Sequence, residues 1–523
     1  MQIRLATRGS RLALAQSGMI ADALRDLGAT VELVRVRTFG DASTAPLATI
    51  GGTGVFVVAV REAVLNGACD IAVHSLKDLP TTPADGLAMA AIPAREDPRD
   101  ALCARDGLGL AALPFGARVG TGSPRRVAQL ALARPDLELV DIRGNVDTRL
   151  ARVSNDLDAV VLAVAGLNRI GRSDAISEYL DPDLMVPAPA QGALAIECRS
   201  DDTAVRALLA ELDHPDTRAA IELERSVMRL VEAGCSAPFG ALATVANGWL
   251  SAHVRLVNGP VDRRAMGACP VGDTGRLAEQ LADQVAPLRG LRVLMPMSGM
   301  ASPLSAAGAS VTQVRLTRTE LIEVEPLLAA VASGGFDTVA FTSARTPAVL
   351  AESGVDLADL LPAEVRVAAV GPATAAAVEG AGLRVDLRVT AGGGAALAEA
   401  LGAGGPVLVP GAEDPAPGLA AGLQAAGRPV IAVPVYRTVA TDNVDAAAVA
   451  GWPQDYDAFV VTAPSAARAA AALLGLPGPP VVALGSTSAT AAGEAGFDVV
   501  AVAAEPTAAG LTAALTQRRK DRA

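Results

Sequence analysis

The chain has 523 residues, of which 51% are hydrophobic and only 2% aromatic, and its formal net charge is −12. This charge argues against the general basic surface of a nucleic-acid-binding protein, and the longest apolar run, residues 159–167, is too short to cross a bilayer. The length predicts about three to five domains.

Short apolar strands alternate with helices rich in alanine and leucine, which is the pattern of α/β domains. In the first half we expect strands at 2–7, 31–37, 71–73 and 158–164, and helices at 11–27 and 217–233. The last helix ends at Gly234, a favourable residue after a helix terminus, so Cys235 is expected in a tight loop.

The character of the sequence changes near residues 287–291, where a second set of strands and helices begins without clustered basic motifs. Within this half the segment 337–343 resembles 457–465, and 367–371 resembles 481–485. Two related α/β lobes are the simplest account of such internal similarity.

Arginine stands beside small polar residues at three turns of the first half, 7–10, 120–126 and 143–149. A helix N-terminus offers free N–H donors, Ser and Thr add hydroxyls, and arginine adds a bidentate fork. Together the three turns predict a cleft for a ligand with several carboxylates or phosphates. Ordinary helix caps with solvated arginines are the alternative for any single turn.

Lysine is rare, because Lys77 and Lys520 are the only two in the sequence. Lys77 stands beside Asp78 after a short apolar strand, so a cation and a carboxylate meet at a strand end. Asp78 is suited to stabilising a cationic transition state or moving a proton, whereas a local ion pair is the alternative. We interpret the nearby His74 as a structural histidine.

The five cysteines lack CxxC spacing, which favours neither a disulfide framework nor a zinc site. Residues 1–10 contain no apolar signal core. We therefore expect a soluble, cytoplasmic protein without a metal centre.

A family resemblance rests on a series of ordered segments: 5–10, 12–16, 70–78, 95–100, 121–126, 143–149, 162–167 and 191–194. These segments resemble hydroxymethylbilane synthase (porphobilinogen deaminase) over about residues 1–289. The resemblance implies that four porphobilinogen molecules are joined into hydroxymethylbilane with loss of ammonia. It also implies a dipyrromethane cofactor, bound through a thioether to Cys235.

The same resemblance assigns roles to individual residues. Asp78 and Lys77 would be catalytic, with Asp78 stabilising positive charge on the pyrrole rings. The residues implied to bind the cofactor and the carboxylates are Cys235, Arg8, Ser10, Gln16, Lys77, Asp78, Thr121, Ser123, Arg125, Arg126, Arg143 and Arg149.

This chain departs from the common family pattern at several positions. Gly122 stands where serine is common, and Asp147 replaces a frequent glycine. Thr49 and Thr53 occupy positions often held by lysine, which puts a cationic-lid role for the Gly51–Phe56 loop in doubt.

The second half, about 290–517, resembles uroporphyrinogen-III synthase more loosely. The supporting segments are 341–343, 369–371, 407–411, 434–438 and 461–462. The resemblance implies two lobes joined by connectors near 314–324 and 433–440, and cyclisation of hydroxymethylbilane with inversion of ring D. Tyr436 matches a cleft tyrosine that assists loss of the substrate hydroxyl, whereas a strand-end tyrosine with a satisfied hydroxyl is the alternative. The family's early Thr-Arg motif is absent, since residues 295–298 read Met-Pro-Met-Ser.

The expected fold class is α/β and multi-domain: a two-lobed clamp like periplasmic binding proteins, a small α/β domain, and two Rossmann-like lobes. The expected domains are 1–94 with a return segment at 190–208, then 95–189, 213–289 and 290–517. Within the last, one lobe would comprise about 290–315 plus 440–517, and the other about 322–434.

Two alternatives come from other classes of protein. The first half could be a solute-binding module, although such a module has no use for an anchored thiol. The second half could be a non-catalytic regulatory or partner-binding module. We expect a monomer that acts on the small molecules porphobilinogen and hydroxymethylbilane, with no nucleic-acid or membrane partner.

Overall fold

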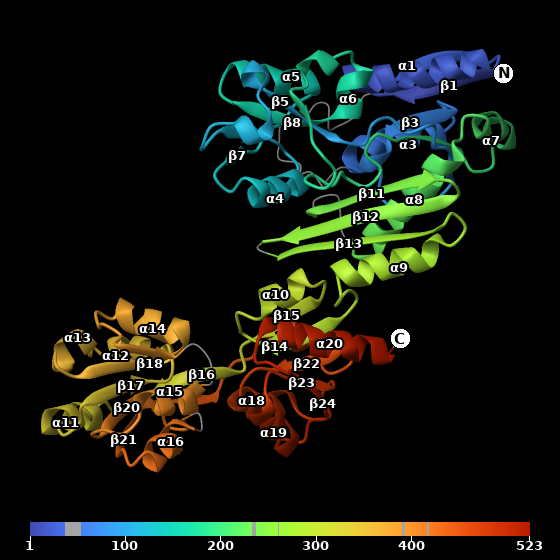
Figure 1. The fold of residues 1–523 in the computed structure, drawn as a ribbon. Helices are drawn as coiled ribbons and strands as arrows, with labels where there is room; N and C mark the ends of the chain where they lie inside the picture. The colour runs from blue at the N-terminus through green and yellow to red at the C-terminus, as the bar shows by residue number, and fades with distance from the viewer. Residues whose placement is uncertain (37–53, 233–236, 260, 390–392, 416–417, 523) are drawn as a thin grey trace. The chain divides into compact units, whose positions relative to one another are not determined.

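The computed structural model describes residues 1–36, 54–232, 237–259, 261–389, 393–415 and 418–522. The chain divides into two compact units: Met1–Leu291 with Ser302–Ser310, and Arg292–Ala301 with Val311–Ala523. Both units combine helices with β-sheets (Figure 1), which confirms the multi-domain α/β class. In the described ranges no helix is both long and apolar enough to span a membrane.

The first sheet contains a strand that returns from far along the chain. Its order is β2 (Thr30–Arg35), β1 (Gln2–Thr7), β3 (Ile71–Ser75), β10 (Leu194–Arg199) and β4 (Leu87–Ala91). β1 is parallel to β2 and β3, whereas β10 is antiparallel to β3 and β4. The accompanying helices are α1 (Arg11–Asp26), α3 (Gly54–Leu65), α7 (Thr203–Ala210) and the 3-10 turn η1 (Leu76–Asp78).

The second sheet is formed by the part of the sequence between β4 and β10, both of which belong to the first sheet. Its order is β7 (Glu138–Val140), β6 (Arg118–Gly120), β8 (Ala159–Ala163), β5 (Asp100–Ala104) and β9 (Glu178–Tyr179). β6 is parallel to β7 and β8. Its helices are α4 (Pro124–Ala133), α5 (Val146–Ala151) and α6 (Val164–Arg169), with short 3-10 turns at Arg105–Gly107, Leu110–Ala112, Arg152–Ser154 and Ser173–Ala175.

Two crossovers join these sheets: residues 92–99 lead from β4 to β5, and residues 180–193 lead from β9 to β10. They contact each other, because the Glu96 amide donates to the Gly192 carbonyl at 3.2 Å. Gly192 has φ +90, and a Cβ there would lie 2.3 Å from the Glu96 carbonyl oxygen. Only glycine fits this close approach of the two crossovers.

The third sheet is an antiparallel meander of β11 (Phe239–Ala246), β12 (Trp249–Asn258) and β13 (Val261–Pro270). Helices α8 (Pro215–Leu230) and α9 (Thr274–Val285) pack against it (Figure 1). The interior is formed by Leu223 and Val227 of α8, Leu281 of α9, and inward-facing residues of the strands. The alternating burial along β12 is that of a sheet covered on one face.

The second unit contains two further sheets. One has the order β15 (Ser310–Val314), β14 (Arg292–Pro296), β22 (Ala458–Val461), β23 (Val481–Ala483) and β24 (Val499–Val502). The other has the order β16 (Thr317–Leu321), β21 (Val430–Ala440), β20 (Val407–Ala412), β17 (Thr338–Phe341), β18 (Arg366–Val370) and β19 (Leu387–Val389). β16 and β21 pair antiparallel, with Thr317 opposite Ala440 and Leu321 opposite Tyr436.

Helices follow most strands of these sheets, as expected for α/β lobes. Along the sheet that contains β14 they are α10 (Ala301–Ala306), α17 (Ala446–Val449), α18 (Pro464–Leu474), α19 (Ser486–Glu494) and α20 (Ala508–Arg522). Along the sheet that contains β17 they are α11 (Glu325–Ser333), α12 (Arg345–Glu352), α13 (Leu357–Leu360), α14 (Gly371–Gly380), α15 (Gly393–Leu401) and α16 (Leu419–Ala425). The similar segments 337–343 and 457–465 contain β17 and β22, which lie in different sheets.

Candidate active site

The first charged turns lie at one edge of the first sheet. β1 and β3 are parallel neighbours, so the residues that follow them meet at the same edge. Ser10 caps α1 by accepting from the Ala13 amide at 3.2 Å. Gln16 of α1 donates to the Ser75 hydroxyl at 2.8 Å, which ties this helix to the turn that carries Lys77 and Asp78.

The second sheet repeats this arrangement. β6 is followed by α4, and parallel β7 is followed by the loop into α5. Thr121 is buried, and its hydroxyl accepts from the Ser123 amide at 3.3 Å. Arg125 and Arg126 lie in the first turn of α4. Arg149 of α5 donates to the Gly144 carbonyl at 2.8 Å.

Asp100 of β5 is the buried centre of the charges at the second sheet. The side chains of Arg125, Arg126 and Asp100 are 4%, 6% and 0% exposed. Arg126 donates to Asp100 Oδ1 at 2.7 Å, and Arg125 lies 2.8 Å from Asp100 Oδ2. Burial opposes ionisation of Asp100, but the two guanidiniums outweigh it and hold its pKa well below the usual range. A ligand carboxylate at this point would share its arginines with Asp100.

Lys77, in the turn after β3 of the first sheet, connects that sheet to these charges. Its Nζ donates to Gln191 Oε1 at 3.1 Å, and Gln191 Nε2 donates to Asp100 Oδ1 at 2.9 Å. Burial lowers the pKa of Lys77 to about 8, although Asp78 opposes this shift. Asp78 itself is exposed.

Arg149 completes what we call the charged cluster: Lys77, Asp78, Asp100, Arg125, Arg126 and Arg149. Burial lowers the pKa of Arg149, and the charge of Arg126 lowers it further while Asp141 and Asp78 oppose the shift. The cluster therefore contains residues next to the first and the second sheet whose charges influence one another. Arg8 is half-buried and Arg143 is exposed, each in the turn where the sequence places it.

Two departures from the family pattern have structural reasons. A Cβ at Gly122 would lie 2.6 Å from the Ile142 carbonyl oxygen, so serine does not fit this turn without a shift. Asp147 lies 3.2 Å from Arg11 of α1 and 3.7 Å from Arg172. It therefore links α1 of the first lobe to α5 of the second.

Glu224 of α8 holds both crossovers. It is 1% exposed, and it accepts from Arg95 Nη1 at 2.6 Å and from the Ala190 amide at 2.6 Å. The Ala243 amide of β11 donates to it as well, at 2.7 Å. One carboxylate thus joins α8 and β11 to the two crossovers.

Cys235 lies outside the described residues, as do Thr49 and Thr53. The described flanks of Cys235 are α8, which ends at Leu230, and β11, which begins at Phe239. The four described cysteines are all buried: Cys69, Cys103, Cys198 and Cys269. Burial raises the pKa of each thiol, to about 12 for Cys103 and about 11 for Cys198. None of these four has the reactive thiolate that an anchor needs.

Tyr436 lies on β21 and is 5% exposed within an apolar cluster that includes Phe341 and Val435. The neighbouring β16 carries polar side chains. Arg437 donates to Glu320 at 2.7 Å, and Arg318 lies 2.7 Å from the same carboxylate. Arg345 of α12 donates to the Thr319 hydroxyl. Tyr436 is therefore a mostly buried residue beside an ion-paired strand connection.

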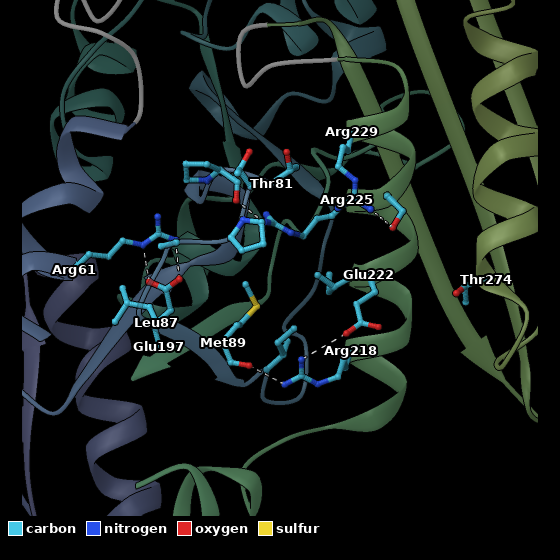
Figure 2. Close-up of a pocket in the computed structure, with 17 residues that line it drawn as sticks. Arg61, Thr81, Leu87, Met89, Glu197, Arg218, Glu222, Arg225, Arg229 and Thr274 are labelled. Atoms are coloured by element: carbon cyan, nitrogen blue, oxygen red, sulfur yellow. Dashed lines mark hydrogen bonds and ion pairs between the residues drawn. The ribbon is translucent and has the colours of Figure 1, made fainter. Parts of the chain in front are cut away.

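A pocket of about 490 Å³ lies elsewhere in the first unit, between α8 and the segment 80–92 (Figure 2). Arg61 and Glu197 contribute one wall, and Arg218 and Arg225 of α8 contribute another. None of the site residues predicted from the sequence lines it. The described part of the chain also contains no group of three His, Cys, Asp or Glu placed to hold a metal.

Asp100, Gln191 and Glu224 are polar residues at this site to which the sequence analysis assigned no role. Asp100 and Gln191 stand inside segments that carried the family resemblance, 95–100 and 191–194. Their place in these segments was the signal by which the sequence could have identified Asp100 and Gln191 as site residues. Helical spacing was the signal for Glu224: it lies four residues after Ala220 and three before Val227, on the buried face of α8, whereas Glu222 is exposed.

Two family models match the chain. Residues 3–207 match "Porphobilinogen deaminase, dipyromethane cofactor binding domain", and residues 298–513 match "Uroporphyrinogen-III synthase HemD". Porphobilinogen deaminase 1 of Streptomyces coelicolor is 53% identical over 55% of this chain and 98% of its own length. Porphobilinogen deaminase of Leifsonia xyli is 50% identical over 55% of this chain and 96% of its own.

Solved structures similar to the chain include two kinds of protein. A mutant uroporphyrinogen III synthase from Thermus thermophilus is 19% identical, covers 44% of this chain and 100% of its own, and has a TM-score of 0.30. The periplasmic VFT2 domain of Bordetella pertussis BvgS is 15% identical, covers 40% of this chain and 86% of its own, and has a TM-score of 0.26.

Proposed function

Because the chain belongs to the porphobilinogen deaminase family, we propose that the charged cluster is the place where its first half joins porphobilinogen units. The chain carries a porphobilinogen deaminase domain followed by a uroporphyrinogen-III synthase domain. It is thus a bifunctional enzyme of tetrapyrrole biosynthesis. The first domain makes hydroxymethylbilane with release of ammonia, and the second closes it to uroporphyrinogen III.

The observation that carries the site is the Lys77–Gln191–Asp100 connection between the lobes. Porphobilinogen loses ammonia from its aminomethyl group and leaves an electrophilic carbon conjugated to the ring. The free α-carbon of the preceding pyrrole attacks this carbon and then loses its proton. We infer that the Asp78 carboxylate stabilises the positive charge shared by the rings and takes up pyrrole protons.

The surrounding cations fit a ligand with many carboxylates. Six cations lie in the three arginine turns (7–10, 120–126 and 143–149) and beside Asp78, where cations outnumber carboxylates: Arg8, Lys77, Arg125, Arg126, Arg143 and Arg149. Arg125 Nε is buried and has no hydrogen-bond acceptor in the described structure. Ser10, Gln16, Thr121 and Ser123 add polar groups at the same edges. When bound, the dipyrromethane cofactor supplies the primer to which new units are added.

We assign the anchor of that primer to Cys235. The family resemblance assigns this role to Cys235, and the raised pKa values of the buried described thiols make them poor nucleophiles. Cys235 follows α8 in the sequence, and Glu224 ties this helix to both crossovers. We infer that such a tether holds the primer near the two crossovers.

The domain assignment is part of the proposal. We assign 1–94 with 190–208 and 95–189 to the two lobes of a clamp like periplasmic binding proteins, and 213–289 to the third domain. The segment 290–517 forms the synthase, with Rossmann-like lobes of about 290–315 plus 440–517 and about 322–434. The return of β10 into the first sheet supports the first assignment.

In the synthase we propose that Tyr436 assists loss of the substrate hydroxyl. Its place on β21, one of the two connecting strands, supports this role. Its burial among apolar residues favours the alternative of a packed strand tyrosine. Replacing Tyr436 with phenylalanine separates the two: a slower cyclisation supports the catalytic role, and unchanged cyclisation contradicts it.

We place the enzyme in the cytoplasm as a monomer, with no nucleic-acid or membrane partner. The acidic net charge supports the absence of a nucleic-acid partner. Sedimentation velocity measures the oligomeric state directly, and a stable dimer would contradict it.

Intact-mass spectrometry of the purified chain tests the anchor. The proposal predicts a mass excess equal to one dipyrromethane, located on Cys235 by peptide mapping. Cys235→Ser is expected to remove the excess, while Cys269→Ser in β13 leaves it in place. An unmodified chain, or a modification on another cysteine, overturns the anchor.

A further inference from the structure

Gln191 is a fully shielded amide that contacts both lobes of the first unit. Gln191 belongs to the second crossover, residues 180–193, and is 1% exposed. The oxygen accepts from Lys77 of the first lobe at 3.1 Å. The nitrogen donates to Asp100 of the second lobe at 2.9 Å and to the Pro98 carbonyl of the first crossover at 2.8 Å.

The chemistry of the partners fixes the direction of this amide. An ammonium only donates hydrogen bonds, and an ionised carboxylate only accepts them. The bridge therefore needs an acceptor at one end and a donor at the other. Glutamate would lose the donor toward Asp100, and an apolar residue would lose both.

We propose that Gln191 is a positioning residue: it holds the Lys77 ammonium at the charged cluster and couples it to the arginines through Asp100. The inference rests on the proposed function and adds to it a residue that need not touch substrate. With one N–H engaged by Gln191, the Lys77 ammonium keeps two donors for a ligand carboxylate. Asp100 in turn orients Arg125 and Arg126, so one hydrogen-bonded chain sets three cations.

In the described part of the chain, charges from both lobes act on Lys77. Asp78 adjoins it on the same turn, Arg125 and Arg126 face it from α4, and Asp100 faces it from β5. Removing the Gln191 oxygen takes an acceptor from the ammonium but leaves these four charges in the sequence. The effect of Gln191 on Lys77 can therefore be measured by itself.

The sequence supplies an unusually clean probe. Lys77 and Lys520 are the only lysines, so lysine labelled with 13C at Cε gives two signals in the full-length holoenzyme. Lys520 is exposed in α20 and serves as the internal reference. We expect the wild-type Lys77 signal to titrate near pH 8.

Gln191→Met keeps the length of the side chain and removes its polar ends. Its Lys77 midpoint is expected to fall by about one pH unit, and kcat to fall about tenfold to a hundredfold, because a hydrogen bond to a charged group is lost. Gln191→Glu places a carboxylate beside Lys77 and is expected to raise the midpoint. This second variant also decides the question if the first does not fold.

Gln129→Met is the matched control. Gln129 is an equally buried amide that bonds the Val186 backbone and Arg255 but not Lys77. It should lower stability and leave the Lys77 midpoint in place. A Lys77 midpoint that is the same in wild type, Gln191→Met and Gln191→Glu overturns the proposal. Failure of the wild type to consume porphobilinogen would instead overturn the proposed function, because the titration needs no turnover.

Discussion

Asp78 and Asp100 are both carboxylates beside cations, yet their surroundings suit them to different tasks. Asp100 is completely buried, and its carboxylate pairs with two guanidiniums and accepts a hydrogen bond from the Gln191 amide. Asp78 is exposed at the end of a short 3-10 turn. A carboxylate already bound by protein groups sets geometry, whereas an exposed one can meet a ligand.

Asp78→Asn removes the negative charge and keeps the shape of the side chain. We expect kcat to fall about a hundredfold or more, because stabilisation of a developing charge is lost. The melting temperature should change little, since the residue is exposed. Steady-state assays of porphobilinogen consumption measure this effect, with the exposed Asp85→Asn as the control. Equal activity in the two variants would remove Asp78 from the mechanism.

Asp100→Asn leaves two buried guanidiniums without their anion. We expect it to lower the free energy of unfolding by about 3–5 kcal/mol, the usual cost of removing one partner of a buried ion pair. Urea denaturation followed by circular dichroism measures the change. A loss below about 1 kcal/mol would mean that Asp100 is not the centre of the cluster.

The sequence predicted where the charged residues lie better than it predicted the buried polar residues that they contact. Strand, turn and helix signals placed Arg8, Asp78, Arg125 and Arg149 in the turns and helices that follow strands, because these signals are local. The partners Asp100 and Gln191 are selected by tertiary contacts between lobes, which no local period reports. The need for glycine at position 122 also depends on a distant carbonyl, that of Ile142.

At the scale of elements, two buried carboxylates hold the first unit together. Glu197 of β10 accepts from Arg61 of α3 at 2.7 and 2.8 Å and lies 3.3 Å from His74 of β3. Glu224 of α8 joins the crossovers to β11. Each of these carboxylates thus contacts helices, strands or crossovers that are far apart in the sequence. The sequence suggested the return of the chain near residue 190 but not these contacts.

Stability in acid should depend on Glu197. Burial opposes its ionisation, but His74 and Arg61 lower its pKa from 4.5 to about 2. Because the folded-state pKa is the lower one, this stabilisation is complete above about pH 4.5 and is lost as the pH falls toward 2. Its full value is about 3 kcal/mol. Unfolding free energies between pH 2 and 6 should therefore vary less in Glu197→Gln than in wild type. Glu138→Gln, at an exposed ion pair, is the control, and identical curves for wild type and Glu197→Gln would refute the assignment.

Glu224→Gln tests the link between α8 and the crossovers. It leaves Arg95 without a charged partner in a buried site, so we expect a loss of about 3–5 kcal/mol in unfolding free energy. Glu222→Gln on the same helix is the matched control, because Glu222 is exposed. Thermal and urea unfolding of both variants provide the comparison. Equal stability of the two would show that the crossovers are held by other contacts.

At the scale of the whole molecule, two compact units carry two family domains in succession. The product of the first activity is the substrate of the second. Hydroxymethylbilane also closes without a catalyst, to the isomer in which ring D is not inverted. The order of the units along the chain therefore has a chemical purpose that a single measurement can examine.

That measurement is the identity of the product made from porphobilinogen by the full-length chain alone. After oxidation, the uroporphyrin isomers are separated by chromatography. The account predicts isomer III as the main product, and isomer I once the second unit has been inactivated. Isomer I as the only product of the intact chain would contradict the synthase activity, and no consumption of porphobilinogen would contradict the deaminase.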